Sequence, residues 1–191
     1  RLSPTHYFAY LLVVDGNRAA GVAGLECGIE YDAAAQSGVD ILGWTLCAPS
    51  EVPSSGPYGP WPASGSGNRI RWDAATQCQR AVPSGNNAAD GVVATAGYFY
   101  CAAYSSDRLA VVSRPGSGQA VVMDCGGSAS VIDGVGHPAG NLPQLGFAGF
   151  SADGLVPGYN PCGVAAVLVR PTTWGSIKAM YATPPAKGTT P

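Results

Sequence analysis

The segment Val22-Ala23-Gly24-Leu25-Glu26-Cys27-Gly28-Ile29-Glu30-Tyr31 decides the fold class. Apolar residues alternate along it with polar or small ones, which is the period of a β-strand with one buried face. The apolar positions are Leu25, Cys27, Ile29 and Tyr31, and the charged positions opposite them are Glu26 and Glu30. The segment therefore predicts a half-buried strand.

Further β-forming runs lie on both sides of this segment and predict about eight to ten strands in all. They are 7–14, 40–47, 68–73, 92–104, 109–112, 120–124 and 164–169, with weaker candidates at 129–132 and 146–150. The turn sequence at 114–118 predicts that the runs on either side of it form a hairpin. Residues 48–67, rich in Pro, Ser and Gly, predict a long loop.

The composition supports an all-β domain and excludes several functional classes. Only 12% of the 191 residues are charged, whereas Gly (27) and Pro (16) are abundant and 46% are hydrophobic. Short strands joined by many turns suit this composition, whereas charged amphipathic helices do not. The net charge of −2 gives no basic surface for nucleic acid. No apolar run approaches the length of a membrane span, about 18 residues.

The chain divides into a β-sandwich domain at 1–170 and a C-terminal extension at 171–191. Within the extension, Trp174, Ile177 and Tyr181 follow a helical spacing, which predicts a short amphipathic helix at 172–181. A Pro/Thr-rich tail follows. The first strand begins soon after Arg1 and no signal peptide is visible, so we expect a mature, processed chain.

Six widely spaced cysteines predict disulfides and hence an oxidising, extracellular compartment. They are Cys27, Cys47, Cys78, Cys101, Cys125 and Cys162, and no two form a C-x-x-C pair. Many pairings remain possible. The preferred set joins Cys27 to Cys101, Cys47 to Cys78 and Cys125 to Cys162, because these bonds would link two strong strands, close the 48–67 loop and fasten the C-terminal region.

Two motifs resemble cohesin modules: Val22 to Asp32, and Asp90-Gly91-Val92-Val93-Ala94-Thr95. The resemblance spans roughly residues 5–125 and implies a jelly-roll β-sandwich on an exported protein that binds proteins or builds extracellular scaffolds. Cohesins lack these cysteines, and no partner-binding surface transfers. The ending Thr-Thr-Trp-Gly-x-Ile-Lys at 172–178 resembles the C-termini of uncharacterised secreted bacterial proteins with this core. The expected fold is thus a cohesin-like β-sandwich with a disulfide-tied C-terminal extension.

The sequence offers no recognisable catalytic site and implies no cofactor. His6 and His137 are the only histidines, and Gly126-Gly127-Ser128-Ala129-Ser130 fails the nucleophile-elbow pattern at its last position. Aspartates beside Gly, Ala or Ser at strand ends are typical of turns, although paired carboxylates could also serve a glycosidase. They are Asp32, Asp73, Asp90, Asp107, Asp124, Asp133 and Asp153. A calcium loop stays an alternative, but no metal-binding motif is present.

Aromatic residues could bind a glycan by stacking. Tyr58 and Trp61 in the long loop are the candidates, whereas Trp44 and Trp72 are expected to fill the core because they lie on strands.

The strands near the two chain ends are candidates for self-assembly, because a terminal strand can complete the sheet of a neighbouring copy. The candidate residues are Tyr7, Phe8, Tyr10, Leu12 and Val14, with Val164, Val167, Val169 and Trp174. Pairing of both strands within their own domain is the alternative.

The sequence predicts a non-catalytic extracellular or cell-surface structural subunit that self-assembles, as a homo-oligomer, filament or surface layer, through β-strand contacts. A secreted carbohydrate- or protein-binding module is the alternative, and a glycoside-active enzyme ranks third.

Overall fold

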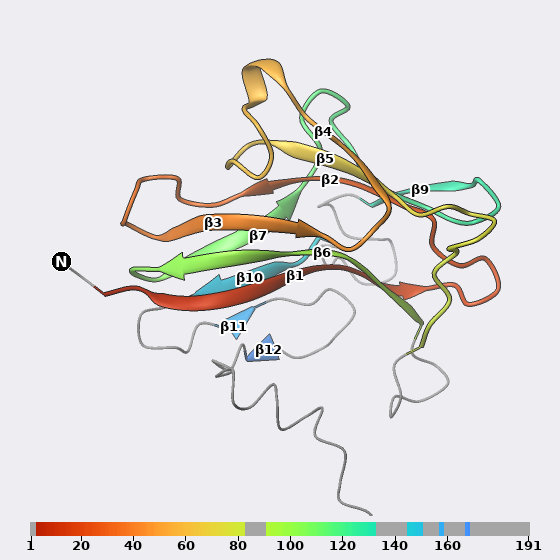
Figure 1. Ribbon diagram of the computed structural model, residues 1–191, viewed down its shortest axis with the longest axis horizontal. Helices are drawn as coiled ribbons and strands as arrows, with labels where there is room; N and C mark the ends of the chain where they lie inside the picture. The colour runs from red at the N-terminus through yellow and green to blue at the C-terminus, as the bar shows by residue number, and fades with distance from the viewer. Residues whose placement is uncertain (1–2, 83–90, 133–144, 151–156, 159–166, 169–191) are drawn as a thin grey trace, which may run out of the picture.

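The computed structural model describes residues 3–82, 91–132, 145–150, 157–158 and 167–168. These residues form β-strands and one short 3-10 turn, η1 (Gly56–Tyr58). The strands belong to two main sheets whose buried faces share one hydrophobic core (Figure 1). The prediction of an all-β sandwich is confirmed.

The smaller sheet has the order β1-β6-β3 and is antiparallel throughout. Its strands are β1 (Thr5–Gly16), β3 (Val39–Leu46) and β6 (Val92–Ala103), and β6 lies in the middle (Figure 1). Along β1, buried residues alternate with exposed ones, as the period of a strand requires. The predicted strands at 7–14, 40–47 and 92–104 are confirmed with small shifts of their ends.

The larger sheet has seven strands, with the order β10-β7-β2-β5-β4 and with β8 and β9 beside it. These strands are β2 (Gly24–Glu30), β4 (Ser50–Pro53), β5 (Gly67–Arg71), β7 (Asp107–Val112), β8 (Ala120–Met123), β9 (Ala129–Ile132) and β10 (Phe147–Phe150). Leu25, Cys27 and Ile29 are buried, as the alternation predicts, while Glu26 and Glu30 point to the other face.

The predicted hairpin of 109–112 with 120–124 is wrong. The turn itself forms, with a bridge between Arg114 and Gln119. However, β7 pairs with the second half of β2 and β8 with its first half, so the two strands follow one another along the same neighbour. Pairing with β2 lets both strands bury an apolar face in the core, which an isolated hairpin cannot do.

The predicted loop at 48–67 contains a strand that the sequence did not reveal. β4 pairs with β5 from Ser50 to Pro53, at the end of the sheet order, where a proline is tolerated. The loop proper is therefore shorter and includes η1 and a cis peptide bond between Trp61 and Pro62.

The core between the sheets is apolar and includes the two tryptophans that were expected there. Trp72 is buried, and Trp44 packs partly buried against Phe99 with a ring-centroid distance of 4.7 Å. Gly97 makes this contact possible, because a Cβ there would lie 2.3 Å from Trp44 Cη2. The Trp44 indole N–H donates to Glu51 Oε2 at 3.0 Å and so connects β3 to β4.

The preferred disulfide pairing is wrong, because Cys78 bonds to Cys125. Val22 and Gln79 form a bridge, and Cys125 N–H donates to Ala20 C=O at 3.2 Å, so both cysteines meet beside the turn after β1. Their Cα atoms lie 5.9 Å apart, within the usual range for a disulfide. The bond fastens the segment after β5 to the end of β8, and Cys125 is no longer available to the C-terminal extension.

The predicted bond between Cys27 and Cys101 does not form either, and Cys47 remains without its predicted partner Cys78. Cys27 and Cys101 are buried free thiols on β2 and β6, which belong to different sheets. Cys47 is exposed and free at the end of β3. Cys162 lies outside the described residues.

The C-terminal region is described only in part. β11 (Pro157–Gly158) and β12 (Val167–Leu168) form a short antiparallel pair, so the strand predicted at 164–169 is observed for two residues. Val164, Val169, Trp174 and the predicted helix at 172–181 lie outside the described residues, as does the proposed boundary at residue 170.

Candidate functional site: an aromatic face on the three-stranded sheet

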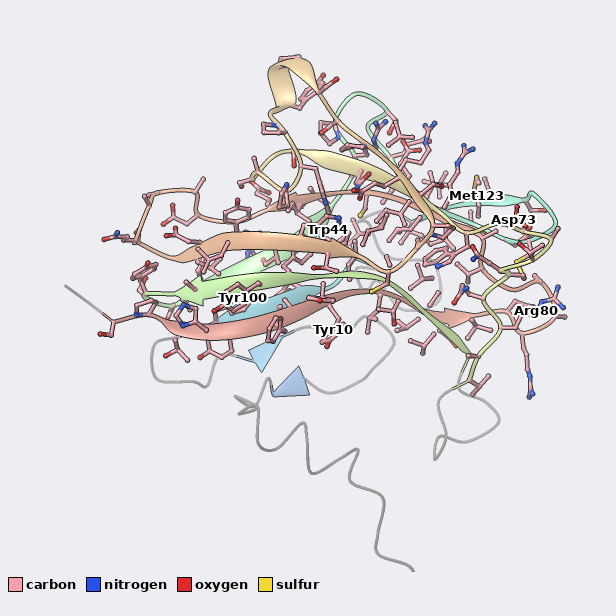
Figure 2. The ribbon with its side chains drawn as sticks, in the orientation of Figure 1. Tyr10, Trp44, Asp73, Arg80, Tyr100 and Met123 are labelled. Atoms are coloured by element: carbon pink, nitrogen blue, oxygen red, sulfur yellow. A yellow bond between two sulfur atoms is a disulfide. The ribbon has the colours of Figure 1, made fainter. Side chains whose placement is uncertain are left out.

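The outer face of β1, β6 and β3 carries a group of exposed apolar side chains, which we name the aromatic face. It consists of His6, Phe8, Tyr10, Leu12, Leu42, Tyr98 and Tyr100. Phe8, Tyr10 and Leu12 are 49%, 60% and 42% exposed, and they come from the outward positions of a single strand. Tyr100 and Leu42 add exposed apolar surface from β6 and β3. Figure 2 shows Tyr10 and Tyr100 on these neighbouring strands.

Backbone register brings the rings of β1 and β6 together. Phe8 lies directly opposite Tyr100, and Tyr10 lies opposite Tyr98. Directly opposed and diagonal side chains on one face of an antiparallel pair are close enough to interact. The result is a continuous row in which rings from the two strands alternate: His6, Tyr100, Phe8, Tyr98, Tyr10.

The rings in this row cover one another's faces. His6 and Tyr100 are stacked, with centroids 5.5 Å apart and planes 18° apart. Phe8 and Tyr100 are 5.3 Å apart and tilted by 30°, whereas Phe8 meets Tyr98 edge-on at 78°. Each ring contacts the next one along the row, and Phe8, Tyr10 and Tyr100 keep exposed surface against which aromatic side chains of another protein could pack.

Charge is almost absent from the aromatic face. In β1, β6 and β3 the acidic residues are Asp15 and Asp40, each within one residue of a strand end, and these strands contain no lysine or arginine. Charged side chains on a sheet usually protect it against association with other chains. The three-stranded sheet lacks that protection.

The outer face of the seven-stranded sheet is charged instead. Glu26 on β2 bonds Arg69 on β5, with Oε2 and Nε 2.7 Å apart, and its Oε1 lies 3.6 Å from Arg114 Nη1. Partial burial alone would raise the pKa of Glu26. The hydrogen bonds from Arg69 and Ser117 and the charges of both arginines outweigh it and hold that pKa below its usual value.

The candidate assembly residues on β1 divide by the period of the strand. Phe8, Tyr10 and Leu12 are on the aromatic face and Val14 is half-buried, whereas Tyr7 points into the core and packs against Phe150. β1 stands at the end of the sheet order of the described strands, but Thr5 and Tyr7 have further interactions. The side-chain face of β1, rather than its backbone edge, is therefore the candidate contact surface.

The two candidate glycan-stacking residues lie in different surroundings. Trp61 is partly buried and packs against Trp44 and Phe99, with its indole N–H buried and without a partner. Tyr58 is exposed, near the turn at Gly116. The structure does not combine them into one flat platform.

Several aspartates that could have served catalysis have turn functions instead. Asp73 accepts hydrogen bonds from the backbone of Ala75 and Thr76, and Asp124 accepts one from Ser128 N–H at 2.8 Å. Asp32 accepts the backbone N–H of Ala34, whereas Asp107 accepts the N–H groups of Asp32 and Val39, which are distant in sequence. Asp32, Asp73 and Asp124 confirm the turn interpretation, whereas Asp107 connects β7 to the segment between β2 and β3. Among the residues the structure describes, no group of three or more His, Cys, Asp or Glu side chains could hold a metal ion.

Sequence reasoning missed Tyr98 and Tyr100, although both lie in a run that it assigned to a central strand. A continuous apolar run does not tell which of its residues face outward. In a regular strand Tyr98 and Tyr100 would share the buried face of Ala94 and Ala96. They face outward because the pairing with β1 shifts by one residue at Ala96, where Leu11 pairs with Gly97 and Leu12 with Thr95.

Comparison with known proteins adds little to this description. No family model matches the sequence, and no curated protein matches it. Among solved structures, the chain is similar to the cohesin module of a family 33 glycoside hydrolase from Clostridium perfringens ATCC13124, with a TM-score of 0.39 and 11% identity, over 79% of this chain and 97% of that module. No helix of the described residues is long and apolar enough to cross a membrane. At this degree of likeness, no property of that module passes to this chain.

Proposed function

We propose that this protein is a non-catalytic extracellular structural subunit that associates with copies of itself through the aromatic face. The observation that carries the proposal is the row of exposed rings on β1 and β6, which lies on a sheet face without cations. Burial of such rings against another chain is favourable, at about 25 cal/mol per Å² of apolar surface. Aromatic residues are also enriched among the residues that dominate binding at protein interfaces.

The compartment part of the proposal is supported by the Cys78–Cys125 bond, since disulfides persist chiefly in oxidising environments. The non-catalytic part is supported by the local roles of the aspartates and by the position of His6. Its ring stacks on Tyr100 as part of the aromatic face. A general base would instead be positioned by an acid and beside a nucleophile.

The proposal is tested by measuring the weight-average mass of the purified full chain by light scattering over a range of concentrations. We expect the mass to rise with concentration. The double variant Phe8→Ser/Tyr10→Ser should associate at least tenfold more weakly, because loss of one central aromatic residue often costs about 1–2 kcal/mol or more.

Val131→Ser is the matched control, because Val131 is 52% exposed on β9, away from the aromatic face. It should associate like the unchanged chain. A wild-type chain that stays monomeric at all concentrations, or equal weakening by Val131→Ser, would contradict the proposal.

A glycan-binding module is the second candidate, supported by the exposed ring of Tyr58, which is 44% accessible. Glycan-array binding that is lost in Tyr58→Ala, with retention of self-association, would favour this function. Trp61→Ala is less informative, because the Trp61 ring packs against the core and its removal disturbs Trp44 and Phe99.

A further inference from the structure

The disulfide between Cys78 and Cys125 lies beside an arginine at the surface of the sandwich. Both cysteines are only partly buried, and Arg80 is exposed. The Nε–H of Arg80 donates to Cys78 Sγ at 3.1 Å. Figure 2 shows Arg80 at the same end of the sandwich as Met123, the last residue of β8. A positive charge therefore contacts the Cys78 sulfur directly.

We propose that this bond is a thiol-exchange site, at which an external low-molecular-weight thiol of the glutathione class attacks Cys125 and Cys78 leaves. In such an exchange a thiolate attacks one sulfur atom and the other departs as a thiolate. Departure is faster when the leaving thiolate is stabilised, and a neighbouring arginine stabilises a thiolate. Because Arg80 contacts Cys78 Sγ, negative charge is best accommodated on that sulfur.

The surroundings of the two sulfur atoms favour the same direction of attack. Gly21 packs on both of them, and a Cβ there would lie 2.4 Å from Cys78 Sγ and 2.9 Å from Cys125 Sγ. Cys78 Sγ is covered further by Arg80. Two residues after Cys125, by contrast, a Cβ on Gly127 would have no atom within 4 Å. An incoming thiol therefore meets less obstruction at Cys125.

The exchange needs no oxidant, and the external thiol is its only co-reactant. The attacking sulfur forms a bond with Cys125 Sγ, the bond between Cys125 and Cys78 breaks, and its electron pair stays on Cys78 Sγ beside the guanidinium of Arg80. The product is a mixed disulfide at Cys125. In the reverse step the Cys78 thiolate attacks Cys125 Sγ, expels the external thiol and restores the original bond.

Backbone contacts hold the two cysteine segments in place independently of the disulfide. Gln79 and Val22 exchange two hydrogen bonds of 2.9 Å, next to Cys78 in the sequence. Cys125 N–H donates to Ala20 C=O at 3.2 Å. Both segments are thus attached to the turn after β1, so we expect the cysteines to stay close when the bond opens and the exchange to be reversible in the folded protein.

Glutathione is the probe, used on the folded full chain. The reaction is stopped at intervals with iodoacetamide, which blocks accessible free thiols, and peptide mass spectrometry measures each cysteine separately. We expect glutathione on Cys125 and the iodoacetamide label on Cys78. Removal of glutathione before the iodoacetamide step should restore the disulfide.

Arg80→Met should slow formation of the Cys125 adduct about threefold or more, because the leaving thiolate loses its neighbouring cation. Arg108→Met is the matched control and should leave the rate unchanged. Arg108 is exposed on β7, where its guanidinium lies 5.9 Å from the centroid of the Phe147 ring, and its replacement changes the net charge by the same amount.

Three outcomes would each overturn the inference: a glutathione adduct on Cys78, equal rates for Arg80→Met and Arg108→Met, or a bond that exchanges only in denaturant. None of these measurements depends on association between copies of the chain. The inference and the proposed function can therefore fail separately.

Discussion

Gly21 leaves the space that the disulfide occupies. Its φ of 70° lies in the left-handed region, and a Cβ there would be 2.4 Å from Cys78 Sγ and 2.9 Å from Cys125 Sγ. Arg80 Nε also donates to Cys78 Sγ, at 3.1 Å. The disulfide therefore packs directly on the glycine, and the turn after β1 can approach it only because no side chain intervenes.

Gly21→Ala should consequently lower the free energy of unfolding by more than the cost of placing alanine in a left-handed backbone conformation. Gly118→Ala is the matched control, because Gly118 has a similar φ of 68° but no atom within 4 Å of the added Cβ. We expect about 1 kcal/mol of lost unfolding free energy for Gly118→Ala, from the left-handed backbone. The overlap with sulfur should add about 1–3 kcal/mol for Gly21→Ala. Equal losses in urea unfolding would show that the contact with the disulfide is unimportant.

The free cysteines should differ in reactivity. Burial raises the pKa of the Cys27 thiol to about 12, with a smaller contribution from the charge of Glu26, and burial raises the pKa of Cys101 to about 12 as well. At pH 8 only about one in ten thousand of these thiols would be ionised, and thiolate is the reactive form.

Iodoacetamide should therefore modify exposed Cys47 in the folded protein and leave Cys27 and Cys101 untouched until denaturant is added. Peptide mass spectrometry measures each site separately. Modification of Cys27 as fast as Cys47 in the folded state would contradict the buried thiol assignment.

At the scale of strands, Glu26 connects β2 to β5 and to the turn that follows β7. Because its pKa is lowered in the folded state, its ionised form stabilises the protein. That contribution is present above the unfolded pKa of about 4.3 and is lost as the pH falls through the lower, folded pKa.

Glu26→Gln should therefore lower the unfolding free energy at pH 7, and the difference from the unchanged chain should shrink below about pH 4. Chemical denaturation at several pH values measures this difference. A difference that is constant between pH 3 and pH 7 would show that the charge of Glu26 is not the cause.

Sequence reasoning identified the strands whose residues show a β-strand pattern without reference to a pairing partner. The alternation at Val22–Tyr31 and the weak runs that became β9 and β10 were correctly located. β4 was missed because Pro53 and its neighbouring serines are typical of loops, and its pairing depends on β5. The hairpin prediction failed because β2, distant in sequence, competes successfully for both β7 and β8.

For the same reason, the sequence predicted the part of the aromatic face that lies on β1 but not the part that lies on β6. Phe8, Tyr10 and Leu12 follow from the alternation within β1, but their meeting with Tyr98 and Tyr100 depends on the register between β1 and β6. The cysteine pairing was also decided by register, because the bridge between Val22 and Gln79 brings Cys78 to Cys125. No local pattern encodes either alignment.

At the scale of the whole molecule, the protein is a sandwich with two unlike outer surfaces. One is an uncharged row of rings, and the other carries the Glu26 ion-pair cluster and further arginines. This asymmetry supports association through the first surface and solvent exposure of the second. Exposed Cys47 lies at the end of β3, on the same sheet as the aromatic face.

Hydroxyl-radical footprinting at rising protein concentration tests the central claim most directly, because it reports the exposure of individual side chains in solution. Phe8, Tyr10 and Tyr100 should be oxidised readily in dilute protein and become severalfold protected as the chain associates. Tyr58 and Val131 are exposed on other elements, so the oxidation rate of each should be the same at every protein concentration. Oxidation of Phe8 and Tyr10 that stays in constant ratio to that of Tyr58 at every concentration would contradict self-association through the aromatic face.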